Sequence, residues 1–309
     1  MRRFTIDGII NLNKPPGKTS FQMVALVRKL SGERKVGHSG TLDPDATGVL
    51  PILIGQATKL ASFATESTKV YRAQICFGIS TTTYDSSGAT TQEGDTASLT
   101  LKQIEPALDS FRGLIEQTPP MYSAIKQHGR PLYQLARAGI EVPRTPRKVS
   151  IFRLDVTDWQ NPLLVIEVEC SKGTYIRSIA HDLGQRLGCG AHLSKLVRLQ
   201  SGPFRIENAV SVAQLEEAFQ HGCWATLIHP IDTALSHLTA IVVDDASKTE
   251  ISHGRSFPFA QGQERVIEKQ CRAYSTSGQF LALIRLDPEK DLWHPERVFI
   301  DGIPTTPNV

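Results

Sequence analysis

Asp43 is the acidic residue whose surroundings in the sequence are best suited to aimed chemistry. It lies in the segment GHSGTLDPDATGVLPILIG, which runs from Gly37 to Gly55. Pro44 disfavours the α region of the backbone for Asp43, and the glycines before it permit conformations that other residues resist. The apolar run Val49 to Ile54, interrupted by one proline, predicts a buried strand behind the acid. The pattern favours a carboxylate on a rigid, anchored loop, although an ordinary turn with an Asx interaction has the same spacing.

Two motifs near Asp43 each match part of a known functional signature but differ from it at specific positions. The loop NKPPGKTS ends in Gly17-Lys18-Thr19, as a P-loop does. However, Leu12 stands where the first P-loop glycine belongs, and Pro15 and Pro16 lack the N–H donors that cradle phosphates. The run GHSG begins like the hydrolase elbow G-x-S-x-G, but Thr41 replaces its last glycine. The sequence therefore argues against nucleotide binding here and gives little support to a serine hydrolase.

Charge is segregated along the chain. Six basic residues stand against one acid between residues 121 and 148, and six stand against one between residues 171 and 205. Residues 206–250 reverse the balance, with seven acids and one lysine. This pattern is typical of a protein that grips a polyanion with one face, although random clustering on a solvated surface gives the same counts. In the first basic segment Tyr122 with Lys126, and Tyr133 with Arg137, could stack on nucleic acid, or the second pair could be neighbours on a helix face.

The composition is that of an ordinary globular protein. The chain has 309 residues, 40% hydrophobic and 21% charged, which suits one large domain and a small one. No apolar run reaches the roughly 18 residues of a membrane span, and the N-terminus lacks the apolar region of a signal peptide. The five cysteines are odd in number and form no C-x-x-C pair. They predict reduced thiols in the cytoplasm, with neither a disulfide framework nor a zinc site.

Hydrophobic periodicity and capping residues predict alternating strands and helices around these segments. The predicted strands cover residues 8–12, 49–54, 69–77, 148–159, 163–170 and 191–198. The predicted helices cover residues 21–30 with Ser20 as N-cap, 56–64, 101–111, 131–138, 176–187 and 212–220. Residues 81–95 are predicted to be a loop, and residues 119–148 a basic insertion that stands off the core. After a boundary at 235–238, a short helix and strands at 265–267, 280–286 and 297–300 predict a small β-rich domain.

Arg177 opens the predicted helix at 176–187, whose buried stripe is Ile176, Ile179, Ala180 and Leu183. With Tyr175 it lies where the chain turns from strand into helix. An arginine in that place can hold a carboxylate with two hydrogen bonds and keep it ionised. A surface arginine near a helix start is the simpler alternative.

Three ordered segments together resemble a known family. GHSGTLDPDATGVLPILIGQATKL, with NLNKPPGKTS before it and KVYRA after it, is similar to the first signature of the TruB-type tRNA pseudouridine synthases. CSKGTYIRSIAHDLGQRLGCGAHLSKLVRLQSGPF is similar to the second, and PPMYSAIKQHGRPLYQLARAGIEVPR resembles the RNA-gripping insertion between them. The likeness runs from Gly8 to Phe204, and the C-terminal part loosely resembles PUA-like domains.

The resemblance implies an α+β fold with a mixed, mostly antiparallel central sheet flanked by helices and loops. The catalytic domain would cover residues 1–236, with the insertion at about 119–148, and a PUA-like RNA-binding domain would cover 237–309. The implied activity is isomerisation of uridine to pseudouridine at position 55, in the T-loop of tRNA. No cofactor or metal is needed, since the uracil is detached, rotated and rejoined through carbon. The protein would be a cytoplasmic monomer that uses no guide RNA.

The family motifs also imply roles for individual residues of this chain. Asp43 would be the nucleophile, Arg177 would pair with it and keep it charged, and Tyr71 would stack on the target base near the proton removed last. The substrate-binding positions implied or predicted are His38 (in the gap left by the flipped nucleotide), Tyr175, Leu196, Lys14 with Pro15, Asp85, Lys126, Arg130 and Arg137. Thr82 departs from the family, because an acid usually occupies that position, and any polar network through it is in doubt.

Two alternatives remain. A guide-RNA-dependent, dyskerin-type subunit shares the GHSGTLDP core, but its insertion is reduced and it carries extensions that this chain lacks. A tRNA-binding or folding protein could use the same surface without catalysis. Whether Asp43 first attacks ribose C1′ or the base also stays open.

Overall fold

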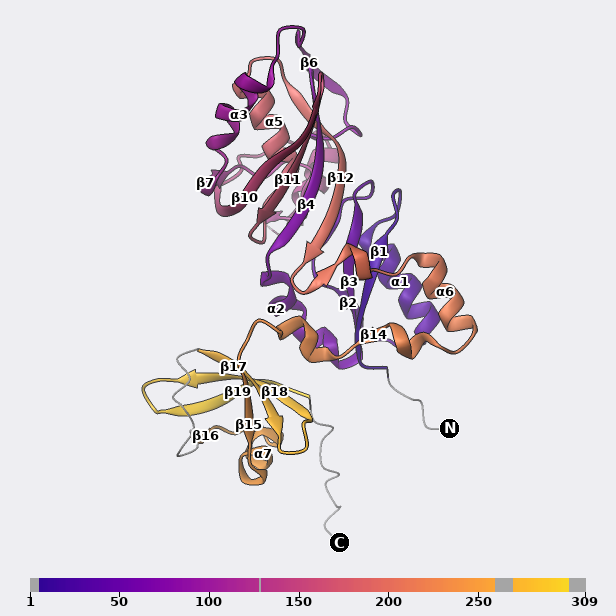
Figure 1. The fold of residues 1–309 in the computed structure, drawn as a ribbon, viewed down its shortest axis with the longest axis vertical. Helices are drawn as coiled ribbons and strands as arrows, with labels where there is room; N and C mark the ends of the chain where they lie inside the picture. The colour runs from indigo at the N-terminus through magenta and orange to yellow at the C-terminus, as the bar shows by residue number, and fades with distance from the viewer. Residues whose placement is uncertain (1–5, 128, 259–268, 300–309) are drawn as a thin grey trace.

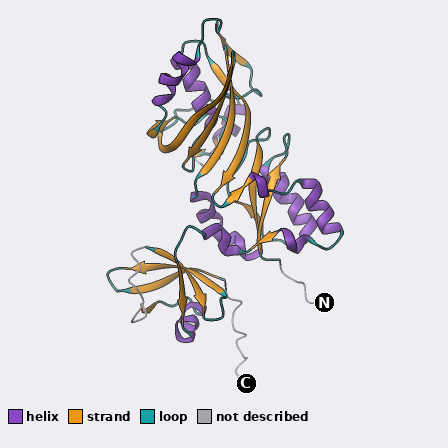
Figure 2. Ribbon diagram, viewed as in Figure 1, coloured by secondary structure: helices purple, strands orange, loops and turns teal. Residues whose placement is uncertain are grey.

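One large mixed sheet forms the body of the protein (Figures 1 and 2). The structure, a computed structural model, describes residues 6–127, 129–258 and 269–299. Within them the strand order is β14-β1-β3-β12-β4-β11-β10-β7, with β2 beside β3 and β13 beside β12. All of these strands pair antiparallel except β3 with β12. The strands are β1 (Gly8–Lys14), β2 (Val36–His38), β3 (Thr47–Ile54), β4 (Lys69–Phe77), β7 (Gly113–Gln117), β10 (Arg147–Gln160), β11 (Leu163–Cys170), β12 (Ala191–Ser201), β13 (Phe204–Arg205) and β14 (Ile228–His229). The predicted fold class is confirmed.

Helices cover the two halves of this sheet and build a separate core on each. One core joins α3 (Leu101–Asp109) and α5 (Ile176–Arg186) to β4, β10 and β11. The other joins α1 (Ser20–Ser31) and α6 (Val212–Gln220) to β1 and β3. Tyr71 and Leu196 pack against both cores. These two side chains therefore mark the seam between the halves.

The helices around the site form for reasons that the sequence contains. The predicted stripe of α5 is buried, with all four of its residues at most 4% exposed. The prediction for α1 was wrong at its start, because Thr19, not Ser20, is the N-cap, and it forms a capping box with Gln22. Ser20 is free to use its hydroxyl elsewhere, which matters for the site.

Two regions of the first domain differ from the predictions. Residues 81–95 are not all loop, because β5 (Ile79–Thr81) pairs with β6 (Thr90–Glu93). Threonine favours strands even where the sequence is polar on both faces, so this hairpin lacked the apolar alternation that would have revealed it. The insertion contains the hairpin of β8 (Lys126–Gln127) with β9 (Arg130–Pro131), followed by the predicted helix, α4 (Leu132–Arg137).

The other short helices connect the sheet to the C-terminal part. They are η1 (Gly55–Leu60), α2 (Ala61–Glu66), η2 (Ile206–Asn208), η3 (Trp224–Leu227) and η4 (Ile231–Leu235). The predicted helix at 56–64 therefore begins as a 3₁₀ helix and continues as α2. No helix in the part of the chain that the structure describes is both long and apolar enough to cross a membrane.

The C-terminal residues form a second, smaller sheet in the order β15-β17-β18-β19-β16. Its elements are β15 (Ala240–Val243), α7 (Asp245–Ser252), β16 (Phe257–Pro258), β17 (Gln270–Ser275), β18 (Phe280–Asp287) and β19 (Leu292–Val298). The predicted strand at 280–286 is confirmed. The one at 297–300 was placed too late, because Pro295 in β19 disguised its start, and the one at 265–267 lies outside the described residues.

The second sheet is attached directly to the first domain. Leu283 and Phe299 belong to an apolar cluster that also contains Leu53 and Leu60. The Lys59 ammonium donates to the Val298 carbonyl at 2.7 Å. Removing the C-terminal part would therefore expose core residues of the catalytic half.

Candidate active site

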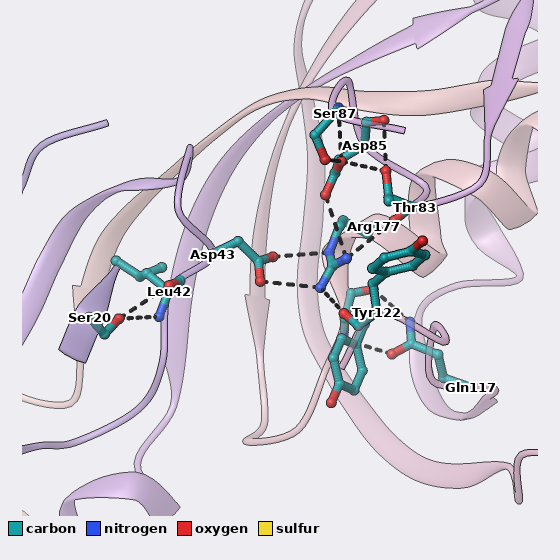
Figure 3. A network of polar contacts seen from close by, with 10 residues as sticks. Ser20, Leu42, Asp43, Thr83, Asp85, Ser87, Gln117, Tyr122 and Arg177 are labelled. Atoms are coloured by element: carbon teal, nitrogen blue, oxygen red, sulfur yellow. Dashed lines mark hydrogen bonds and ion pairs between the residues drawn. The ribbon is translucent and has the colours of Figure 1, made fainter. Parts of the chain in front are cut away.

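The loop between β2 and β3 carries Asp43 and is fastened on both sides of it, and Figure 3 shows the fastening at Leu42. Before Asp43, the buried Ser20 hydroxyl accepts the Leu42 N–H at 2.9 Å and donates to the Leu42 carbonyl at 3.1 Å. After Asp43, the Lys14 ammonium donates to the Pro44 carbonyl at 2.7 Å. The anchored loop predicted from sequence is therefore present, and its anchors come from α1 and β1.

Lys14 is fully buried and joins the N-terminal loop to the Asp43 loop. Its ammonium also donates to the carbonyls of Pro15 at 2.9 Å and Lys18 at 2.6 Å, so that all three of its donors are used. Burial lowers the pKa of Lys14 to about 8, while the Asp45 and Asp43 carboxylates act in the opposite direction. This geometry agrees with the predicted bracing by Lys14 and Pro15.

Arg177, at the start of α5, holds the Asp43 carboxylate with two contacts. Its Nε lies 3.0 Å from one carboxylate oxygen, and its Nη2 donates to the other at 3.2 Å. The arginine side chain is only 6% exposed, whereas that of Asp43 is 40% exposed. The carboxylate is therefore fixed from behind by a buried guanidinium and remains open on its other side.

The pKa of Asp43 is set by opposing influences. Burial raises it from its ordinary value, and the Asp85 carboxylate adds to this effect. The Arg177 guanidinium, and more weakly the Lys14 ammonium, lower it. Arg177 is thus the strongest influence that favours the ionised, nucleophilic form.

Asp85 is a second acid at the same guanidinium, with an oxygen 3.5 Å from Nη1 of Arg177. Its other oxygen accepts from the hydroxyls of Thr83 and Ser87, both at 2.6 Å, and from the Ser87 N–H at 3.0 Å. Thr82 is exposed, so the polar network around Asp85 runs through positions 83 and 87. Thr82 takes part in none of these hydrogen bonds.

Backbone carbonyls hold Arg177 in addition to Asp43. Its guanidinium donates to the carbonyls of Tyr122 at 2.9 Å and Thr83 at 3.2 Å. The buried Gln117 amide accepts the Tyr175 N–H at 2.7 Å and donates to the Tyr175 carbonyl at 2.9 Å. Gln117 was missed by the sequence reasoning, and nothing in the local pattern could have marked it, because its partner is a backbone 58 residues away.

Arg198 on β12 is a further residue that the sequence reasoning missed. It is 1% exposed and lies opposite Tyr71 in the register of β12 with β4. Its Nε donates to the Val49 carbonyl at 2.6 Å, and its Nη2 to the Gly40 carbonyl at 3.2 Å. It therefore supports the Asp43 loop, and its charge opposes the effect of burial on the pKa of the Tyr71 phenol.

Tyr71, Leu196 and His38 complete the set of predicted residues near the seam. Burial raises the pKa of Tyr71, and the Arg198 guanidinium opposes this effect. Burial, and then Arg198, lower the pKa of His38, whose Nδ1 accepts the Gly40 N–H at 3.2 Å. A neutral imidazole results, which suits stacking on a base. The roles of these residues stay predictions.

The predicted basic residues of the insertion lie apart from the Asp43 carboxylate. Lys126, Arg130 and Arg137 are exposed, and Arg137 lies over the Tyr133 ring at 5.7 Å, so these two are neighbours on α4. The insertion does not stand off the core entirely, because the Tyr122 backbone contacts Arg177. The basic side chains of the insertion are therefore exposed to solvent, whereas the backbone at its root contacts Arg177.

In the described part of the chain, no group of three or more His, Cys, Asp or Glu side chains is arranged to hold a metal ion. The residues described above are a carboxylate, a guanidinium, a phenol and apolar walls. Such a set can supply a nucleophile, a surface for stacking and a proton acceptor.

Comparison with known proteins identifies the family. Residues 28–176 match the N-terminal domain of the TruB family of pseudouridylate synthases, and residues 177–236 match the C-terminal domain of tRNA pseudouridylate synthase B. The chain is 44% identical to tRNA pseudouridine synthase B of Dehalococcoides mccartyi, over 97% of this chain and 98% of that protein. It is 46% identical to that of Symbiobacterium thermophilum, over 81% and 82%.

A solved structure is also similar, the crystal structure of a Cbf5-Nop10-Gar1 complex. The TM-score is 0.70 at 28% identity, covering 90% of this chain and 78% of that one. The two family domains together span residues 28–236 and divide between Ile176 and Arg177, so Asp43 and its arginine partner come from different domains of the match. On this evidence the chain belongs to the TruB family of pseudouridylate synthases.

Proposed function

We propose that this protein isomerises uridine to pseudouridine in tRNA, at position 55 in the T-loop, with Asp43 as nucleophile. The observation that carries the proposal is the Asp43 carboxylate, held by Arg177 at 3.0 and 3.2 Å yet open on one side. The names of relatives that match nearly the whole chain support the reaction and the substrate class.

The target uracil has to leave its stack to reach this site. Extruding a base from folded RNA costs a few kcal/mol, and contacts between the basic segments and phosphates would offset that cost. Tyr71 and Leu196, at the seam between the two cores, provide an aromatic face and an apolar wall for the extruded base. His38 would fill the gap that the base leaves. The protein would act as a monomer in the cytoplasm, with no guide RNA.

Two observations favour this function over a guide-RNA-dependent subunit. The two relatives described above, both named tRNA pseudouridine synthase B, are 44% and 46% identical to this chain, against 28% for the chain from the Cbf5-Nop10-Gar1 complex. The chain also carries its own exposed basic hairpin and helix at residues 126–137, whose root touches the catalytic arginine. An enzyme that grips RNA without a guide needs such a surface.

The test is incubation of the purified protein with an unmodified tRNA transcript, followed by mapping of pseudouridine. We expect a single site in the T-loop for the wild type. Asp43→Asn keeps the size of the side chain but removes its charge, and it should bind the tRNA without forming pseudouridine. Glu217→Gln, an exposed acid on α6, serves as the matched control and should keep full activity.

The outcomes separate the alternatives. Pseudouridine formed by Asp43→Asn would show that the nucleophile is misassigned. Binding without pseudouridine in the wild type would point to the tRNA-binding or folding protein. Activity that appears only after a guide RNA is added would point to the dyskerin-type subunit.

A further inference from the structure

Arg198 is a buried cation. Neither the family resemblance nor the reaction outlined above assigns a role to it. It is among the largest fully buried side chains of the described residues. None of the ion pairs found in residues 6–127, 129–258 and 269–299 involves it. Burying a charge without a counter-charge is costly. A cation kept under these conditions suits a site where negative charge develops later.

The neighbours of Arg198 identify where that charge would develop. Two of its donors bind the Val49 and Gly40 carbonyls, which lie on either side of the Asp43 loop. Tyr71 lies directly opposite Arg198 in the antiparallel pairing of β12 with β4, so the two side chains are neighbours on the same face of the sheet. A cation beside a phenol favours the ionised form of the phenol, and Arg198 acts on the pKa of Tyr71 in this direction. Tyr71 is therefore the group whose charge Arg198 is placed to stabilise.

The space around Arg198 confirms that its position is fixed. A Cβ added to Gly48 would lie 2.3 Å from the Arg198 carbonyl oxygen and 2.8 Å from its nitrogen. The backbones of β3 and β12 thus approach each other as closely as glycine allows at φ +100°. The backbone of Arg198 therefore cannot move relative to β3 without separating these two strands, and its guanidinium is held in turn by the Val49 and Gly40 carbonyls.

We propose that Arg198 is a positioning residue for Tyr71, holding the phenol at the target base and stabilising the negative charge on its oxygen during the last proton transfer. This inference rests on the proposed function. It assigns to β12 a part in the second half of the reaction, whereas Arg177 serves the nucleophile in the first half.

The step balances without a co-reactant. After the uracil has been rejoined, C5 carries both the ribose and its original hydrogen, and C6 is double-bonded to N1. Tyr71 gives its phenol proton to N1, the C5–H bond breaks, and its electron pair forms the C5=C6 double bond while the C6=N1 π pair becomes the N1–H bond. The phenolate oxygen takes the proton from C5, so Tyr71 is a phenol again at the end.

The experiment compares unmodified tRNA with tRNA that carries 5-deuterouridine, in single turnovers at saturating enzyme. For Arg198→Met we expect a rate loss of about 100-fold, the scale found when one donor aimed at a developing oxyanion is removed. We also expect the ratio of the hydrogen to the deuterium rate to rise above that of the wild type, because breaking the C5–H bond becomes rate-limiting. Arg198→Lys keeps the charge but loses the planar fork, and it should give an intermediate ratio.

Ser20→Ala is the matched control, because Ser20 supports the Asp43 loop without touching Tyr71. It should slow the reaction and leave the isotope ratio at the wild-type value. If Arg198→Met and Arg198→Lys also slow the reaction but leave the isotope ratio at the wild-type value, the proposal is overturned, since Arg198 would then only support the loop. An unchanged rate in both would overturn it as well.

The ratio is measured on one enzyme preparation with two substrates, so it does not depend on the fraction of folded protein. If Arg198→Met fails to fold, Arg198→Lys decides the question. A wild type that makes no pseudouridine would instead refute the proposed function. An active wild type, with an isotope ratio that stays unchanged in the variants, would refute only the role of Arg198.

Discussion

The Asp43 loop and the basic insertion are held in opposite ways, although both are assigned to the same RNA. The loop is fixed at Leu42 by Ser20 and at Pro44 by Lys14. The insertion contacts Arg177 through the Tyr122 backbone at its root and leaves the side chains of Lys126, Arg130 and Arg137 in solvent.

This difference reflects two physical tasks. A nucleophile must be placed within a fraction of an ångström, so its loop is secured by buried hydrogen bonds. Phosphate attraction acts over a Debye length of roughly 10 Å and tolerates loose placement. The Tyr122 carbonyl on Arg177 joins the two regions, because a shift of the insertion root would be felt at the guanidinium. The comparison predicts that damage to each region changes a different measured quantity.

The largest expected effect comes from removing the guanidinium with Arg177→Met. The side chain is 6% exposed and holds two contacts to Asp43, so its loss leaves a carboxylate without its counter-charge. A nucleophile that is no longer held in its productive position loses on the order of 100-fold in rate. Single-turnover rates at saturating enzyme should show this loss while the Kd for tRNA changes little.

Arg186→Met is the control for this prediction, since Arg186 lies on the same helix and is exposed. It should retain the wild-type rate. Arg177→Lys keeps a point charge but not the two-donor fork, and its rate should lie between the other two. A weakened Kd with an unchanged rate in Arg177→Met would mean that Arg177 belongs functionally with the insertion.

A moderate effect, on binding alone, is expected from neutralising Lys126, Arg130 and Arg137 together. These side chains are exposed, and each phosphate contact contributes about one unit to the slope of log Kd against log salt. The triple variant should bind tRNA more weakly at low salt, with that slope reduced by about 2 to 3. Its rate at saturating enzyme should be unchanged.

A second triple variant, Lys29, Lys102 and Arg153 to glutamine, removes the same charge from exposed sites outside the insertion and the C-terminal domain. It should change the slope far less. Equal slopes for the two triple variants would show that net charge, and not the insertion, attracts the RNA.

The elements that contain their own pattern could be predicted from the sequence. The strand at residues 69–77 and the helix at 212–220 have the predicted bounds, because alternation in the first and a serine cap with an apolar stripe in the second are local signals. The acid on an anchored loop followed from Pro44 and the apolar run after it. These features depend on neighbours within a few residues.

The contacts that complete the site depend on partners far along the chain. Asp43 and Arg177 are 134 residues apart, and only the family motifs suggested their pairing. Ser20, Gln117 and Arg198 act on backbone groups, which every residue possesses, so no side-chain pattern marks their targets. Sequence reasoning singled out Asp43, the proposed nucleophile, and missed most of the groups that hold it in place.

The smallest effect expected at neutral pH concerns the acid limb of the pH–rate profile. This measurement also assigns the cause of the effect most directly. Asp43 must be ionised to attack, and burial raises its pKa above the ordinary value of 3.8. The rate should therefore fall on acidification at a higher pH than an exposed aspartate would give, with a slope of one in log kcat against pH. Arg177 lowers this pKa, so in Arg177→Met the midpoint should move further up.

The same shift has the opposite sign for stability. A carboxyl whose pKa is higher in the folded than in the unfolded state binds more protons when folded, so its contribution is present at low pH and is lost as the pH rises through the folded pKa. Ionisation of Asp43 therefore lowers the stability of the folded protein, and the fixed loop keeps the carboxylate in place despite this cost. The triple variant at Lys126, Arg130 and Arg137 should keep the wild-type midpoint, because these charges are solvated and lie outside the influences on Asp43. A midpoint that moved with the insertion would mean that the two regions share one electrostatic field, and the division of tasks between them would fail.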